Sequence, residues 1–128
     1  MRKTRILLAD SSTFTRILLA NTLETLGFEV VAVAKNGEEA LEQFSQHNPD
    51  IALIDLKLDG MGGIDVVRSL TKDKPSAVVV LLIPENMDDP DIIVEAVRSG
   101  ARAYIKKPTS GEEMKRRLNN LLGARKEK

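Results

Sequence analysis

Five short apolar runs, separated by segments with helical spacing, limit most strongly how this chain can fold. The runs are continuous rather than alternating in polarity, which is typical of strands covered on both faces. They are Ile6–Ala9, Val30–Ala34, Ile51–Ile54, Ala77–Ile83 and Ala103–Ile105. Because strand–helix alternation with connections of this length favours parallel pairing and right-handed crossovers, we predict the α/β class. The expected architecture is a three-layer, doubly wound sandwich around a five-stranded parallel sheet.

The segments between the runs are predicted helices with apolar residues three and four positions apart. Asp89 followed by Pro90 offers a capping acid and a proline at the first helical position. The first helix is expected to end at Gly27 and to be amphipathic. Its apolar residues at shared helical spacing are Phe14, Ile17, Leu18, Leu23 and Leu26.

Composition excludes several classes of protein. The chain has 128 residues, is 42% apolar and 30% charged, and has no cysteine, so we expect one globular domain without disulfides or thiolate sites. Its net charge is zero and its aromatic fraction 3%, which disfavours direct nucleic-acid contact. The longest apolar run is far shorter than a membrane span, so we expect a soluble, cytoplasmic protein.

Charged side chains follow three of the apolar runs directly. Asp10 follows the first run, Asp55 follows the third, and Lys107 closely follows the fifth. The carboxyl ends of parallel strands share one edge of the sheet, which is where ligands bind in open α/β sheets. Two carboxylates and an ammonium at that edge suit a divalent cation together with a phosphoryl group.

The chain resembles the receiver domain of two-component response regulators over nearly its whole length. The resemblance is carried by Leu7–Asp10, Asn36–Leu41, Pro49–Asp55, Gly60–Gly63, Gly100–Ala101 and Tyr104–Pro108. It implies a flavodoxin-like fold with strand order 2-1-3-4-5. It also places the receiver domain at 1–123 and leaves 124–128 as a disordered basic tail.

The resemblance further implies a phosphoacceptor rather than an enzyme, with at most self-catalysed phosphotransfer. Asp55 would take a phosphoryl group from a histidine kinase or phosphotransfer protein, and Lys107 would pair with the phosphoryl oxygens. Magnesium would be held by Asp10, Asp55 and the backbone carbonyl of Lys57. Signalling would pass to a downstream protein through the fourth helix, fifth strand and fifth helix, where Tyr104 occupies the family's aromatic switch position.

Three positions depart from the family pattern near this site. Ser11 replaces the second acid, so it would be at most a weak or water-mediated magnesium ligand, or simply a helix cap. No Ser or Thr occurs from residue 77 to 98, where the family places a hydroxyl after strand four. Counting assigns that place to Glu85 or to Ile83. Lys57 could partly replace the cation, although a solvated lysine is the simpler interpretation.

Asp59 is a further difference, because it replaces a proline that is common in the family; we interpret this change as harmless. The departures favour an alternative function, a degenerate pseudo-receiver that binds partners independently of phosphorylation. A flavin-binding protein is a third hypothesis, since hydroxyl-rich residues 11–15 follow the first strand at a helix start. Against flavin binding, this loop contains no glycine, and the later loops lack the aromatic residues that would enclose a flavin.

Overall fold

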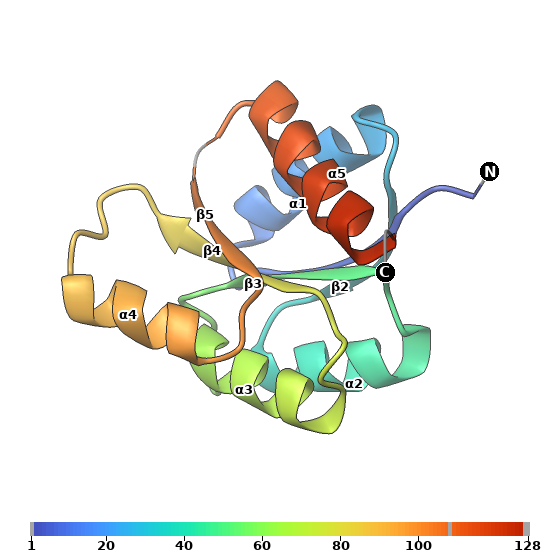
Figure 1. Cartoon of the computed structure of the whole chain (residues 1–128). Helices are drawn as coiled ribbons and strands as arrows, with labels where there is room; N and C mark the ends of the chain where they lie inside the picture. The colour runs from blue at the N-terminus through green and yellow to red at the C-terminus, as the bar shows by residue number, and fades with distance from the viewer. Residues whose placement is uncertain (1, 108, 127–128) are drawn as a thin grey trace.

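The computed structural model describes residues 2–107 and 109–126, which form five strands alternating with five helices (Figure 1). The strands are β1 (Arg5–Ala9), β2 (Glu29–Ala34), β3 (Ile51–Asp55), β4 (Val79–Pro84) and β5 (Ala103–Lys107). The helices are α1 (Thr13–Thr25), α2 (Gly37–His47), α3 (Gly63–Asp73), α4 (Pro90–Arg98) and α5 (Gly111–Lys126).

All strand pairs in the sheet are parallel, and the strand order is β2-β1-β3-β4-β5. The α/β class, the parallel sheet and the strand order are therefore confirmed. Three strands extend further toward their carboxyl ends than the apolar runs, since β3 includes Asp55, β4 includes Pro84 and β5 includes Lys107. Pro84 and Lys107 are partners in the β4–β5 register. Strand β4 ends at Pro84 because proline has no backbone N–H that could continue the ladder of hydrogen bonds.

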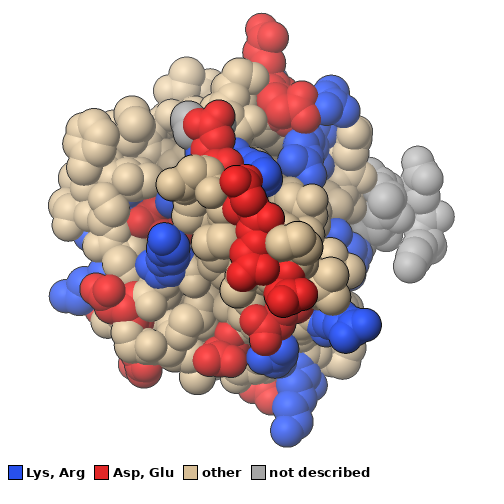
Figure 2. All heavy atoms as spheres, turned by 90° about the vertical axis from the view of Figure 1, so that its left-hand side faces the viewer, with Lys and Arg blue, Asp and Glu red and all other residues tan. Residues whose placement is uncertain are grey.

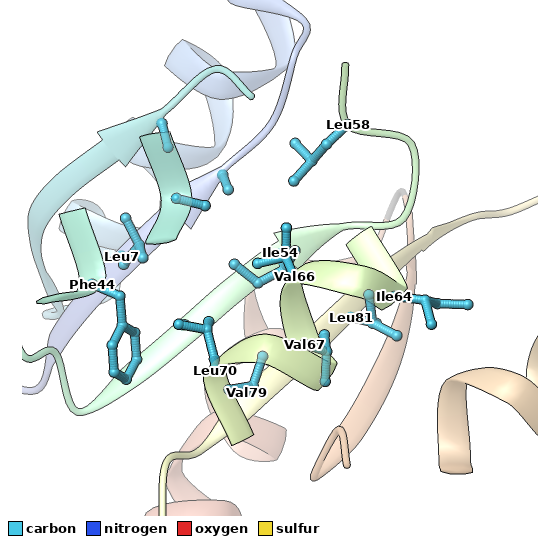
Figure 3. Packing of buried hydrophobic residues seen from close by; sticks show 14 of the residues in the cluster. Leu7, Phe44, Ile54, Leu58, Ile64, Val66, Val67, Leu70, Val79 and Leu81 are labelled. Carbon is cyan, nitrogen blue, oxygen red and sulfur yellow. The ribbon is translucent and has the colours of Figure 1, made fainter. Parts of the chain in front are cut away.

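The sheet separates two apolar clusters. Helices α2, α3 and α4 cover one face, while α1 and α5 cover the other (Figure 1). In the first cluster, Phe44 of α2 lies near Leu7 of β1, and Leu70 of α3 lies near Val79 of β4 (Figure 3). The second cluster, on the other face, includes Leu23 of α1 and Met114 of α5. Complete burial of the central strands on both faces explains why their sequences are continuous apolar runs.

Helix α1 differs from its expected amphipathic pattern. Leu23 is buried, but Phe14 is 76% exposed and Ile17 and Leu18 are more than half exposed. The shared helical spacing therefore does not describe a single core-facing stripe. The N-terminal half of α1 instead presents three large apolar side chains outward, beside the carboxyl edge of the sheet.

The carboxyl end of the chain is described up to Lys126, which is the last residue of α5. Residues 124–126 of the expected tail belong to this helix, and 127–128 lie outside the described residues. The proposed boundary at 123 stays a prediction. Within the described residues, no helix is long and apolar enough to cross a bilayer.

Candidate functional site at the carboxyl edge of the sheet

Three strand ends bring Asp10, Asp55 and Lys107 together. Asp10 directly follows β1, Asp55 ends the neighbouring β3, and Lys107 ends β5. The carboxylates are almost completely buried, with Asp10 1% and Asp55 6% exposed. Lys107 Nζ lies 3.1 Å from Asp10 Oδ2 and 3.3 Å from Asp55 Oδ1. Because β4 separates β5 from β3, the long lysine side chain is what allows β5 to reach these acids.

The Asp10 carboxylate is held from two sides. Its Oδ1 accepts a hydrogen bond from the backbone N–H of Ser12 (2.9 Å), while Oδ2 accepts one from Lys107. The guanidinium of Arg16 donates to the Asp10 carbonyl oxygen (2.7 Å), which fixes the backbone at this turn. No role was predicted for Arg16 from the sequence. The available signal was a basic residue six positions after Asp10, in the first turns of the predicted helix.

Burial raises the pKa of the Asp55 carboxyl group, and Lys107 opposes this by lowering it. The nearby Asp10 carboxylate raises the pKa of Asp55 further, because a like charge disfavours the ionised form of Asp55. The net direction is upward. Asp55 is therefore a buried carboxylate whose negative charge is incompletely compensated by the protein.

One oxygen atom of Asp55 accepts no hydrogen bond from the described residues, and this indicates whether the residues of the site can bind a divalent cation. Asp55 Oδ1 is buried and accepts no hydrogen bond within the described part of the chain, although Lys107 is within ion-pair distance. Carboxylate and carbonyl oxygens are the ligands that magnesium prefers. Among the described residues, no three His, Cys, Asp or Glu side chains form a metal-holding group. The donor set therefore fits a divalent cation, with fewer carboxylates than a strong site would have.

An open cavity of about 620 Å³ lies over Asp55 and Lys107. Lys57 lines it, and so do Pro84 at the end of β4 and Glu85 directly after it. Ile83 is completely buried in the first apolar cluster. Of the two residues proposed for the missing hydroxyl, Ile83 therefore points away from the cavity. Pro84, which lies between the two, lines the cavity and pairs with Lys107 in register.

Ser11 is at the rim of the same cavity, but its hydroxyl group has other partners. It donates to the carbonyl oxygen of Lys35 (3.0 Å) and accepts from the backbone N–H of Asp59 (2.8 Å). The N-cap of α1 is Ser12, whose side chain accepts from the backbone N–H of Thr15. Ser11 is therefore not the cap of this helix.

The face that surrounds the cavity is acidic. Figure 2 shows Asp and Glu side chains in a band across the carboxyl edge of the sheet, with Lys and Arg beside it. The loops of this edge carry exposed carboxylates at Asp59, Glu85, Asp88 and Asp89. A cation would be attracted to this face, whereas a phosphoryl group needs the local positive charge of Lys107.

Comparison with known proteins agrees with this geometry. Residues 6–119 match the response regulator receiver domain family. The chemotaxis protein CheY of Thermotoga maritima is 31% identical over 117 residues, which cover 91% of this chain and 96% of that protein. CheY of Bacillus subtilis is 30% identical over 118 residues, covering 92% and 97%.

A CheY-like receiver domain protein from Methanospirillum hungatei has a similar crystal structure. Its TM-score is 0.88 over 98% of both chains at 24% identity, which establishes likeness of fold. The family match spans most of the chain and includes all three clustered side chains. This chain belongs to the response regulator receiver domain family, and it is a receiver domain of two-component signalling.

Proposed function

We propose that this receiver accepts a phosphoryl group on Asp55 from a histidine kinase or a phosphotransfer protein. The observation that carries the proposal is a buried carboxylate, open to a cavity, with an ammonium 3.3 Å from one of its oxygens. This arrangement provides a nucleophile and a cation for the incoming phosphoryl oxygens at one place.

In the proposed transfer, an Asp55 carboxylate oxygen attacks the phosphorus of a phosphohistidine. The phosphorus–nitrogen bond breaks, and its electron pair stays on the imidazole nitrogen of the donor. Lys107 then pairs with the phosphoryl oxygens while it keeps its contact with Asp10. Asp10, Asp55 and the backbone carbonyl of Lys57 would hold magnesium, which supplies additional positive charge for the phosphoryl oxygens when it is bound.

The exposed apolar side chains of α1 support a docking place for the donor protein. Phe14, Ile17 and Leu18 lie on the helix that begins next to Asp10, and Leu18 lines the cavity over Asp55. A second apolar surface on α4, at Val94 and Val97, supports output to a downstream protein through α4, β5 and α5. With a kinase donor inside the cell, the protein would act in the cytoplasm.

The direct test is incubation with acetyl phosphate and magnesium, followed by intact-mass analysis. We expect a gain of one phosphoryl group in the native protein and none in Asp55→Asn. Asp88→Asn is a matched control, since it removes an exposed carboxylate from the same face and should leave the mass gain unchanged. No mass gain in the native protein would contradict phosphoacceptance.

Pro84 favours a second candidate, a pseudo-receiver that binds partners without phosphorylation. The ring at the end of β4 offers no hydroxyl group to a phosphoryl oxygen, and the turn after it is closed by a hydrogen bond from Met87 N–H to the Pro84 carbonyl (3.0 Å). Failure of the mass test, together with partner binding that is the same for the native protein and Asp55→Asn, would favour this candidate.

A further inference from the structure

The hydroxyl group of Ser11 joins three loops at the carboxyl edge. Ser11 belongs to the loop between β1 and α1, Lys35 to the loop before α2, and Asp59 to the loop between β3 and α3. The hydroxyl donates to the Lys35 carbonyl and accepts from the Asp59 N–H, at 3.0 and 2.8 Å. Its single proton and one of its two acceptor positions are therefore used by the backbone.

Other contacts hold the loop before α2 and the loop between β3 and α3 together. The N–H of Gly37 donates to the carbonyl of Asp59 (3.3 Å), and Asn36 and Asp59 form a parallel bridge. A Cβ at position 37 would lie 2.5 Å from the carbonyl oxygen of Met61, so the loops meet backbone to backbone. The loop that follows Asp55 is therefore held on the side nearer β1 by backbone contacts and by the side chain of Ser11.

The hydrogen bond from the Asp59 N–H to the Ser11 hydroxyl joins two positions that depart from the family pattern. Position 11 carries serine in place of the second acid, and position 59 carries aspartate in place of a common proline. Proline has no N–H, so it could not donate to position 11. The hydrogen bond requires a residue other than proline at position 59, and Ser11 supplies its acceptor, which revises our interpretation of Asp59 as a harmless replacement.

We propose that Ser11 is a positioning residue rather than a metal ligand. By binding the Asp59 N–H, it fixes residues 56–59 and, with them, the backbone carbonyl of Lys57, whether or not a cation is bound. A carboxylate at position 11 would organise the site through the cation, whereas Ser11 organises it through the loop. The part of the proposal that concerns cation binding rests on the proposed function, but the loop contact itself does not.

A double-mutant cycle tests the pair without any phosphodonor. Ser11→Ala removes the acceptor, and Asp59→Pro removes the N–H. Asp59→Ala is the matched control, because it deletes the side chain and keeps the N–H. We expect each of the first two variants to lower the folding equilibrium constant roughly threefold to tenfold in metal-free urea titrations. The double variant should lose no more than either single variant, and Ser11→Thr should recover most of the loss.

Magnesium titration, followed by the amide shifts of residues 55–60, separates positioning from ligation. If Ser11 positions the loop, Asp59→Pro and Ser11→Ala both weaken magnesium binding, by similar severalfold factors, and Asp59→Ala does not. If Ser11 is a ligand, freeing its hydroxyl with Asp59→Pro leaves binding unchanged or makes it tighter. That second result, or additive stability losses in the cycle, would overturn the proposal.

Hydrogen exchange gives a check on the unaltered protein. The Asp59 amide should be protected from exchange in metal-free buffer, and Ser11→Ala should accelerate its exchange while leaving the amides of the central strands unchanged. Rapid exchange of the Asp59 amide in the metal-free native protein would also overturn the proposal. Because none of these measurements uses phosphorylation, a failure of phosphoacceptance would leave their outcomes readable.

Discussion

The ends of β3 and β4 lie side by side in the sheet but differ in what they offer to a phosphoryl group. At β3, Asp55 is buried and contacts a lysine that is also bound to Asp10. At β4, the cavity meets Pro84, followed by the exposed Glu85. The first strand end has the groups that would receive a phosphoryl group, whereas the second lacks a hydroxyl group that would respond to it. In the proposed function, the groups for phosphoryl transfer are kept at β3, while the contact that would report the transfer is changed at β4.

The largest expected effect comes from removing the cation of the retained centre. Lys107→Ala leaves Asp10 and Asp55 buried without a positive partner, so we expect the free energy of unfolding to fall by about 3 kcal/mol at pH 7. Lys106→Ala, at the exposed neighbouring position of β5, is the control and should change it by less than about 0.5 kcal/mol. Equal stabilities of the two variants in urea unfolding would show that Lys107 does not compensate the two acids.

A second effect tests how closely the chain packs behind Asp55. A Cβ on Gly63 would overlap the carbonyl oxygen of Asp55, whereas one on Gly62 would meet nothing within 4 Å. We expect Gly63→Ala to lower the free energy of unfolding by about 2 kcal/mol and Gly62→Ala to change it much less. Similar thermal unfolding of both variants would mean that the β3 end tolerates displacement.

The pH dependence of stability tests the unsatisfied charge of Asp55. Because its pKa is raised on folding, the folded protein binds this proton more tightly than the unfolded chain, and stability falls as the pH rises through the folded pKa. Asp55→Asn should therefore stabilise the metal-free protein at pH 7. The gain should disappear well below the ordinary pKa of an aspartate, where both the folded and the unfolded states are protonated. A variant that is less stable than the native protein at pH 7 would contradict this reasoning.

The smallest effect on stability, and the sharpest test of the β4 side, is Pro84→Thr. The new hydroxyl group would lie in register with Lys107, at the cavity over Asp55. We expect Pro84→Thr to change the free energy of unfolding by less than about 1 kcal/mol. It should increase the change in the Tyr104 amide chemical shift when beryllium fluoride, a phosphate mimic, is added with magnesium. Pro84→Ala removes the ring without adding a hydroxyl group and should not increase that response. If both variants respond alike, the stiffness of proline rather than the missing hydroxyl limits the switch.

The residues that the sequence could place are those fixed by strand ends. Asp10, Asp55 and Lys107 follow apolar runs, so parallel pairing alone brings them to one edge, while the strand order came from the family resemblance. The partners of Ser11 could not be predicted, because they are backbone groups of two other loops. Pro84 could be predicted as the end of β4, since proline cannot donate to the ladder, but counting offered only Glu85 and Ile83 for the place of the hydroxyl.

The exposure of Phe14 and Ile17 could not be predicted from the sequence either. Helical spacing shows which residues share a face, but it does not show which face meets the sheet. The core contacts of α1 come mainly from its second half, around Leu23, where the helix crosses β1 and β2. Tertiary packing therefore decided a question that periodicity left open.

Amide chemical-shift mapping with beryllium fluoride and magnesium tests the contrast between β3 and β4 most directly. A ligand shifts a conformational equilibrium only through contacts that differ between the two states, and the hydroxyl contact at β4 is missing here. We predict large shifts around Asp10, Asp55 and Lys107 and small shifts at Tyr104 and residues 86–99. Large shifts that spread to Tyr104 and across residues 86–99 would contradict the account, and so would an absence of shifts around Asp55.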